Sequence, residues 1–267
     1  PGTGGGAAEP PPDAASSYRV WPLGRQPAAR PGAGMLSDEQ VVACASLLLH
    51  GALGGAAALG VWVTDLASLR SLRESGCPDD LGRWLRGSDV TVYVVACVGP
   101  YGFVSEGDGH WVCLSITSPS PERCAVLVYD SYGIDSIYWR WDSMRHEITE
   151  TMKWVSRAKF AADPTDTQAT CVPVCISDVQ SDTTNCGFHV ALFIASDAAR
   201  REPAGTECFA RLRNCPSNAQ ALRKWAEHQA PWSERAGRRG PPDGPASRAA
   251  LEQLFEAMVP FEVAQDR

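Results

Sequence analysis

Residues 90–98 have the sequence VTVYVVACV, an almost continuous run of apolar and β-branched side chains. Such runs are typical of strands that are covered on both faces, so a central strand is expected from Val90 to Val98. Two more strands are expected from Trp111 to Ile116 and from Cys124 to Tyr129, with a Ser-Pro-Ser-Pro turn at residues 118–121 between them. These three segments predict the core of a sheet.

Helices are expected before and after these strands. Ser37 and Gln40 have the spacing of a capping box, which predicts a helix from Asp38 to about His50. Apolar residues at steps of three and four predict a long amphipathic helix from Ile137 to Val155. The remaining expected elements are a short helix after Asp65, a strand from Cys171 to Ile176, and helices from Cys186 to about Arg200 and from Ser217, as its cap, to about His228.

Composition divides the 267 residues into one folded unit and its appendages. Residues 1–34 are rich in Gly, Pro and Ala and bury too little surface to offset ordering entropy, so a disordered tail is expected. The folded domain is expected over residues 35–228. A Pro, Gly and Arg-rich linker at 229–246 then precedes a C-terminal amphipathic helix within 247–267.

The charge balance limits the class of partner. The chain carries 24 basic and 31 acidic residues, a formal net charge of −7, so no cationic surface for nucleic acid or anionic lipid is expected. No apolar run approaches the ~20 residues of a membrane span, and the first residues lack the pattern of a signal peptide. We therefore expect a soluble, intracellular monomer, cytoplasmic or nuclear.

The ten cysteines show no repeated spacing. Without a secretion signal, free buried thiols are the expected state of most of them. The closest pairs, Cys171 with Cys175 and Cys208 with Cys215, are not CxxC, and no histidine pair completes a zinc-finger spacing. No structural metal is expected.

Cys186 differs from the other cysteines because it is expected at the start of a helix. The free N–H groups and the dipole of a helix N-terminus favour a thiolate. Gly187 would let the backbone pass close to a substrate carbonyl, and the amide of Cys186 is a candidate oxyanion donor. These features predict a nucleophile.

The partners of such a nucleophile can be named from the strand ends. His110 precedes the strand that contains Trp111, and Asp130 ends the next strand, so the carboxylate is a candidate to orient the imidazole as the base. Gln180, six residues before Cys186, is a candidate side-chain oxyanion donor. His189, on the same helical face as Cys186, is the rival base, although its apolar neighbours favour a structural role.

The ordered series H-W, D-S and Q-x5-C-G resembles the ubiquitin-like-protein-specific cysteine proteases, which include the SUMO-specific proteases and, more distantly, the adenovirus processing protease (adenain). The segments LSDEQV at 36–41 and VYVV at 92–95 are also similar to that family, and the resemblance covers about residues 35–200. It implies an α+β, papain-like cysteine peptidase fold of the SUMO-protease/adenain type. A mixed central sheet would be flanked by helices, with the nucleophile at a helix N-terminus.

The resemblance also implies roles for individual residues. Cys186 would be the nucleophile, His110 the base, Asp130 its orienting acid and Gln180 the oxyanion donor. Residues expected to line the substrate channel are Trp111, Met35, Gly187 and Asn185. Asn185 stands where the family usually has Asp, and Met35 where SUMO proteases have Trp. The implied reaction is hydrolysis after a Gly-Gly terminus of SUMO, ubiquitin or another ubiquitin-like modifier, or at a related Gly-rich site, without a cofactor.

Two other classes of function remain open at this point. Effector acetyltransferases share the order His, acid, Cys, although the Trp after His110 and the position of Gln180 argue against an acyltransferase. A protease-derived module that binds a ubiquitin-like protein without cutting it is the other alternative. The presence of all four expected site residues, Cys186, His110, Asp130 and Gln180, argues against a module that has lost its peptidase activity.

Overall fold

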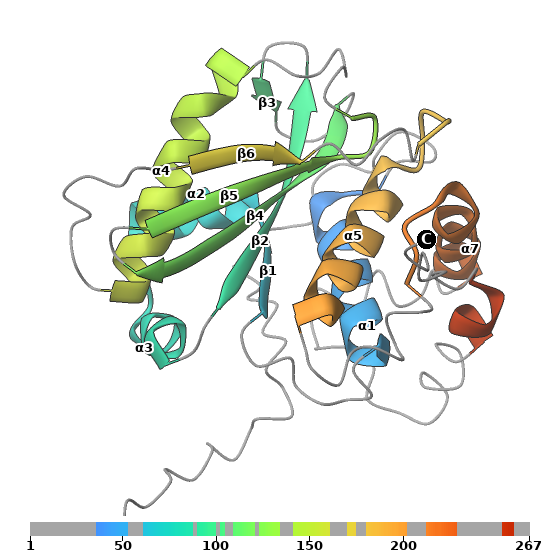
Figure 1. Ribbon diagram of the computed structural model, residues 1–267, viewed down its shortest axis with the longest axis horizontal. Coiled ribbons are helices and arrows are strands. Elements are labelled where there is room, and N and C mark those ends of the chain that lie inside the picture. The colour runs from blue at the N-terminus through green and yellow to red at the C-terminus, as the bar shows by residue number, and fades with distance from the viewer. Residues whose placement is uncertain are drawn as a thin grey trace, which may run out of the picture.

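A mixed α+β architecture, a central mixed sheet flanked by helices, is what the computed structural model shows (Figure 1). It describes residues 36–52, 61–87, 90–99, 102–104, 109–120, 123–133, 141–160, 170–174, 180–201, 212–228 and 253–258. The expected tail at 1–34, the expected channel residue Met35 and the expected linker at 229–246 lie outside these ranges. The mixed sheet flanked by helices confirms the α+β fold class predicted from the sequence.

The sheet is built around the strand that residues 90–98 predict. β2 is Thr91–Gly99, and all nine of its residues are buried. It pairs in parallel with β1 and antiparallel with β3 and β4, while β5 pairs antiparallel with β4 and in parallel with β6. The order across the sheet is thus β1-β2-β4-β5-β6, with β3 on β2. The other strands are β1 (Val61–Asp65), β3 (Gly102–Val104), β4 (His110–Ser120), β5 (Arg123–Asp130) and β6 (Thr170–Val174).

Helices cover both faces of this sheet (Figure 1). On one face, α1 (Asp38–Ala52), α5 (Cys186–Arg201) and α7 (Pro216–His228) share a core cluster with Tyr93 and Val95 of β2. On the other face, α2 (Leu66–Ser75), α3 (Asp79–Gly87) and α4 (Trp141–Phe160) pack on Val92 and Val94. Alternate residues of one strand therefore serve two apolar layers, which explains why its sequence lacks polar alternation.

The first helices begin and end where local sequence signals predict. The N–H of Ser37 donates to Oε1 of Gln40 at 2.9 Å and the N–H of Gln40 donates to Oγ of Ser37 at 3.2 Å, which is the predicted capping box. Asp65 caps α2 by accepting from the N–H of Ser68 at 2.6 Å. Gly76, with φ of 93°, follows the last residue of α2 and takes a conformation that suits glycine.

Several predicted boundaries need correction. β4 continues through Pro119 to Ser120, where the turn was expected, and a register shift between Thr117 and Ser120 accommodates the missing N–H of the proline. α4 begins at Trp141, so Ile137 lies outside the described residues. α7 begins at Pro216, preceded by Cys215 whose carbonyl accepts the N–H of Ala219, so Ser217 is not the cap.

The described part of the C-terminal region packs on the main core. Residues 253–257 are helical, and Leu254, Phe255 and Met258 are buried in the same cluster as α1, α5 and α7. This segment therefore covers apolar surface of the domain. Among the helices of the described ranges, none combines the length and the apolar character needed to cross a membrane.

Candidate active site

The register of the sheet brings the expected base and acid to the same end of neighbouring strands. His110 is the first residue of β4 and Asp130 is the last residue of β5. The two strands run antiparallel, and Val112 of β4 lies opposite Asp130 of β5. His110 is two residues before Val112, so its side chain lies on the same side of the sheet as that of Asp130. Two residues separated along the chain are thereby held next to each other by backbone pairing.

The imidazole and the carboxylate form a buried hydrogen bond. His110 Nε2 donates to Oδ1 of Asp130 at 2.6 Å, and the two side chains are only 2% and 3% exposed. Oδ1 also accepts the backbone N–H of Tyr132 at 2.8 Å, while Oδ2 has no hydrogen-bond partner within the described ranges. Because an ionised carboxylate only accepts, Nε2 is the donor in this bond, and the bond fixes the orientation of the ring.

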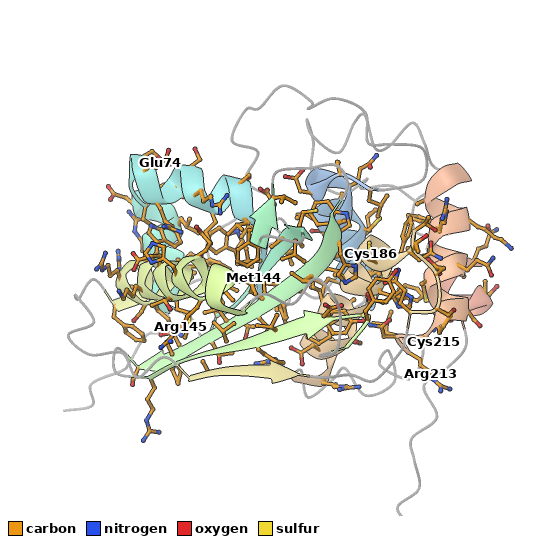
Figure 2. All side chains as sticks on the ribbon, turned by 90° about the horizontal axis from the view of Figure 1, so that it is seen from above. Glu74, Met144, Arg145, Cys186, Arg213 and Cys215 are labelled. Carbon is orange, nitrogen blue, oxygen red and sulfur yellow. The ribbon has the colours of Figure 1, made fainter. Side chains whose placement is uncertain are left out.

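The thiol joins this pair from another part of the fold. Cys186 is the first residue of α5, its side chain is buried, and it is hydrogen-bonded to His110. Since Nε2 is bound to Asp130, Nδ1 is the ring nitrogen left for the sulfur. Figure 2 shows Cys186 where α5 lies beside α1, on the opposite side of the sheet from Met144 of α4. The sulfur, imidazole and carboxylate therefore meet around the end of the sheet.

The charge state of His110 follows from these contacts. Burial by itself lowers the pKa of the imidazole, but the hydrogen bonds to Asp130 and Cys186 and the attraction of their negative charges outweigh burial and raise it from 6.5 to about 9. At neutral pH the ring is therefore protonated. An imidazolium beside a thiol at a helix N-terminus is the arrangement that activates cysteine nucleophiles.

The loop before Cys186 is organised by Asp182. Its carboxylate accepts the backbone N–H groups of Thr184 and Asn185 and the side-chain amide of Asn185, each at 2.8 Å. Burial raises the pKa of Asp182, but these bonds outweigh it, and the net pKa lies below its usual value. From α7, Arg223 donates to Thr184 Oγ1 at 2.8 Å and to Asn185 Oδ1 at 3.3 Å. Asn185 is thus held on both sides, directly before Cys186.

Gln180 takes part in this hydrogen-bond network. Its Nε2 donates to the carbonyl of Asp182 at 2.6 Å and to Tyr132 Oη at 3.3 Å, and its Oε1 accepts from Ser131. These contacts hold the side-chain amide of Gln180 against Tyr132 and Asp182. The backbone N–H of Cys186, in the first turn of α5, belongs to the groups that a helix leaves without an intrahelical partner.

Two of the expected channel residues have clear packing roles. Trp111 is only 3% exposed, and its indole N–H donates to the carbonyl of Leu36 at 3.1 Å. A Cβ on Gly187 would lie 2.9 Å from Val41 Cγ2 and 3.3 Å from both Leu36 Cδ1 and Trp111 Cδ1. The glycine therefore lets α5 approach α1 and Trp111, a reason that the sequence alone did not suggest.

His189, the rival base, lies in the core. Its Nδ1 is 2.8 Å from Oδ1 of Asn214, whose amide also donates to the hydroxyl of Tyr129 and to the carbonyl of His189. Burial lowers the pKa of His189, so its ring is neutral at pH 7. These contacts favour the structural role expected for it.

Three residues of the site were not predicted from the sequence. Tyr132 lies beside His110, Asp182 organises the loop before Cys186, and Arg223 reaches that loop from α7. Of these three, only Asp182 could be suggested from its neighbours in the sequence, because an Asp whose carboxylate accepts the N–H groups two and three residues later is typical of a turn. The other two are recognisable only once distant segments are brought together.

Two other described cysteines are buried thiols. Within the described ranges no cysteine whose side chain is described forms a disulfide bond, and burial raises the pKa of Cys44 to about 12 and that of Cys124 to about 11. No three His, Cys, Asp or Glu side chains converge as a metal site within the part of the chain that the structure describes. Cys186 is distinguished from Cys44 and Cys124 by its histidine partner.

No protein-family model and no curated protein matches the sequence. The central element of the site's geometry is the imidazole of His110, which is hydrogen-bonded to a carboxylate and to a thiol.

Proposed function

We propose that this protein is a thiol peptidase or isopeptidase that cleaves after the Gly-Gly-type terminus of a ubiquitin-like protein or at a related Gly-rich site. One observation carries the proposal: the His110 ring bonds Asp130 at 2.6 Å and also bonds the thiol of Cys186, the first residue of α5. A nucleophile, a base and an orienting acid are thus joined by direct contacts.

The reaction would proceed in two stages. The sulfur of Cys186 attacks the carbonyl carbon of the terminal glycine and forms a C–S bond. As the C–N bond breaks, protonated His110 gives its proton to the leaving amine, and a thioester remains. Neutral His110 then removes a proton from water, whose oxygen attacks the thioester. The sulfur departs as the thiolate beside the re-formed imidazolium, and the carboxylic acid product leaves and loses its proton to solvent.

The developing oxyanion needs donors at each stage. The backbone N–H of Cys186 is the first candidate, because it lies at the positive end of α5. Gln180 becomes the second donor if the oxyanion replaces Tyr132 Oη, since that bond is 3.3 Å long while the bond to the Asp182 carbonyl is 2.6 Å. The longer bond is the weaker of the two.

The substrate class comes from the sequence resemblance, and the observed α+β arrangement is compatible with it. We propose that the fold is of the papain-like, SUMO-protease/adenain type, with the modifier tail passing near Trp111 and Asn185. Asn185 carries no charge, and Arg223 contacts it at 3.3 Å. Which ubiquitin-like protein is recognised would depend on surfaces outside the catalytic residues.

A panel of ubiquitin-like proteins with C-terminal propargylamide groups tests this proposal. The expected result is a covalent adduct of the wild type with at least one member, mapped by mass spectrometry to Cys186, and no adduct with Cys186→Ala. Cys124→Ala is a matched control, because it removes a buried thiol that has no histidine partner among its described contacts, and it should label like the wild type.

The outcomes of the panel separate the other classes of function. Labelling that persists in Cys186→Ala would overturn the assignment of the nucleophile. Acetylation of the protein by acetyl-CoA at Cys186, without hydrolysis of any conjugate, would indicate an acyltransferase. A tight complex with an unmodified ubiquitin-like protein that is never processed would indicate a binding module.

A further inference from the structure

Tyr132 contacts both parts of the catalytic pair on β4 and β5. It follows Asp130 by two residues in the turn after β5, and its backbone N–H donates to Oδ1 of Asp130 at 2.8 Å. Its ring lies against that of His110, with centroids 4.6 Å apart and planes inclined by 30°. The turn therefore supports the carboxylate through the backbone and the imidazole through an aromatic face.

The hydroxyl of Tyr132 reaches the segment that leads to the nucleophile. It donates to the carbonyl of Asp182 at 2.5 Å and accepts from Nε2 of Gln180 at 3.3 Å. The carboxylate of Asp182 in turn holds the backbone N–H of Asn185, the residue before Cys186. A short path of hydrogen bonds thus connects the hydroxyl to the start of α5.

We propose that Tyr132 is a positioning residue that sets the distance between the imidazole of His110 and the sulfur of Cys186. This inference rests on the proposed function and concerns the same site. The base and the nucleophile come from segments that are far apart in the chain, and the hydroxyl ties the turn after β5 to the loop before α5. Because a hydrogen bond weakens steeply with distance and angle, a small drift of that loop reduces the activation of the thiol.

Substitution of Tyr132 by Phe isolates the hydroxyl, because the ring and the backbone N–H remain. Tyr93→Phe is the matched control: it also removes a hydroxyl that donates to an acceptor, here Asp197 at 2.7 Å, but at the other end of α5. Both variants lose one donated hydrogen bond of a tyrosine. Only the first variant loses a contact with the loop before Cys186.

The first measurement is the rate at which iodoacetamide alkylates Cys186 between pH 6 and 9, followed for that peptide by mass spectrometry. For Tyr132→Phe we expect the rate at pH 6 to fall about tenfold, which corresponds to ~1.4 kcal/mol. The rate at pH 9 should change much less, because hydroxide then ionises the thiol without help from His110. Tyr93→Phe should keep the wild-type profile.

The second measurement is turnover of a conjugate of the modifier identified by the propargylamide panel. A positioning role predicts that kcat of Tyr132→Phe falls about tenfold while KM stays within twofold. Thermal unfolding of both variants shows whether they are folded at the assay temperature.

Two results would overturn the inference. One is a wild-type rate and pH profile of alkylation in Tyr132→Phe. The other is the same altered profile in Tyr93→Phe, which would indicate general loosening of the fold. The alkylation arm needs no substrate, so an altered profile in a protein that reacts with no probe of the panel supports the role of Tyr132 and refutes only the substrate class.

Discussion

Replacing Asp130 by Asn should remove a pH-dependent part of the stability of the fold. The substitution keeps the shape of the side chain but deletes the charge that faces His110 at 2.6 Å. In the wild type the pKa of His110 is raised from 6.5 to about 9, against the lowering effect of its burial. At ~1.36 kcal/mol per pH unit, this rise corresponds to about 3 kcal/mol in favour of the folded, protonated state.

The sign of the effect follows from the direction of the pKa change. The folded pKa of His110 lies above the unfolded value, so its contribution is fully present below pH 6.5 and is lost as the pH rises to about 9. In Asp130→Asn, the attraction between the imidazolium and the carboxylate is lost while burial still lowers the pKa, so the pKa of His110 falls. The free energy of unfolding should therefore differ between wild type and variant by roughly 1–3 kcal/mol at pH 6, because Cys186 supplies part of the rise in the pKa, and by much less at pH 9.

Urea unfolding at pH 6, 7, 8 and 9, followed by tryptophan fluorescence, measures this difference. Asp197→Asn is the matched control: it removes a carboxylate that bonds Tyr93 and Arg201, neither of which titrates in this range. Its destabilisation should be the same at every pH. If the difference in free energy of unfolding between wild type and Asp130→Asn does not become smaller toward pH 9, the electrostatic coupling of His110 to Asp130 is refuted.

Three further outcomes are expected. Gly187→Ala should lower the free energy of unfolding by about 1–3 kcal/mol in urea titrations, because the new Cβ would lie 2.9 Å from Val41 Cγ2; an unchanged midpoint would contradict the tight packing of α5 on α1. Arg223→Met should slow alkylation of Cys186 roughly fivefold at pH 6, since the contact with Thr184 is lost. Equal rates in the wild type and the variant would show that α7 does not influence the reactivity of Cys186. Cys124, whose pKa burial raises to about 11, should stay unmodified by iodoacetamide in the folded protein at pH 8, which peptide mass spectrometry can check.

The features that could be predicted from the sequence act over a few residues. The capping box of Ser37 and Gln40 and the cap at Asp65 depend on neighbours three residues away, and their hydrogen bonds are present. The alternation of β4 and β5 was also sufficient to bring His110 and Asp130 to the same sheet end, because antiparallel neighbours share a register over many residues.

The features that were missed depend on distant partners. β1 is only five residues long and passes directly into α2, so no turn residue separates them. α3 buries Leu81 and Leu85, but its charged and glycine-containing sequence after Pro78 is equally typical of a loop. The contacts of Tyr132 with His110 and with Gln180 depend on segments that meet only in the folded chain.

The meeting of His110 and Cys186 around the end of the sheet has a consequence for biosynthesis. His110 and Asp130 lie on adjacent strands, only 20 residues apart, and can pair as soon as both strands have left the ribosome. The sulfur gains its partner only after α5 has been translated and has packed against α1, which closes a much longer loop. In a nascent chain Cys186 therefore lacks its imidazole partner, which it gains only when folding is nearly complete.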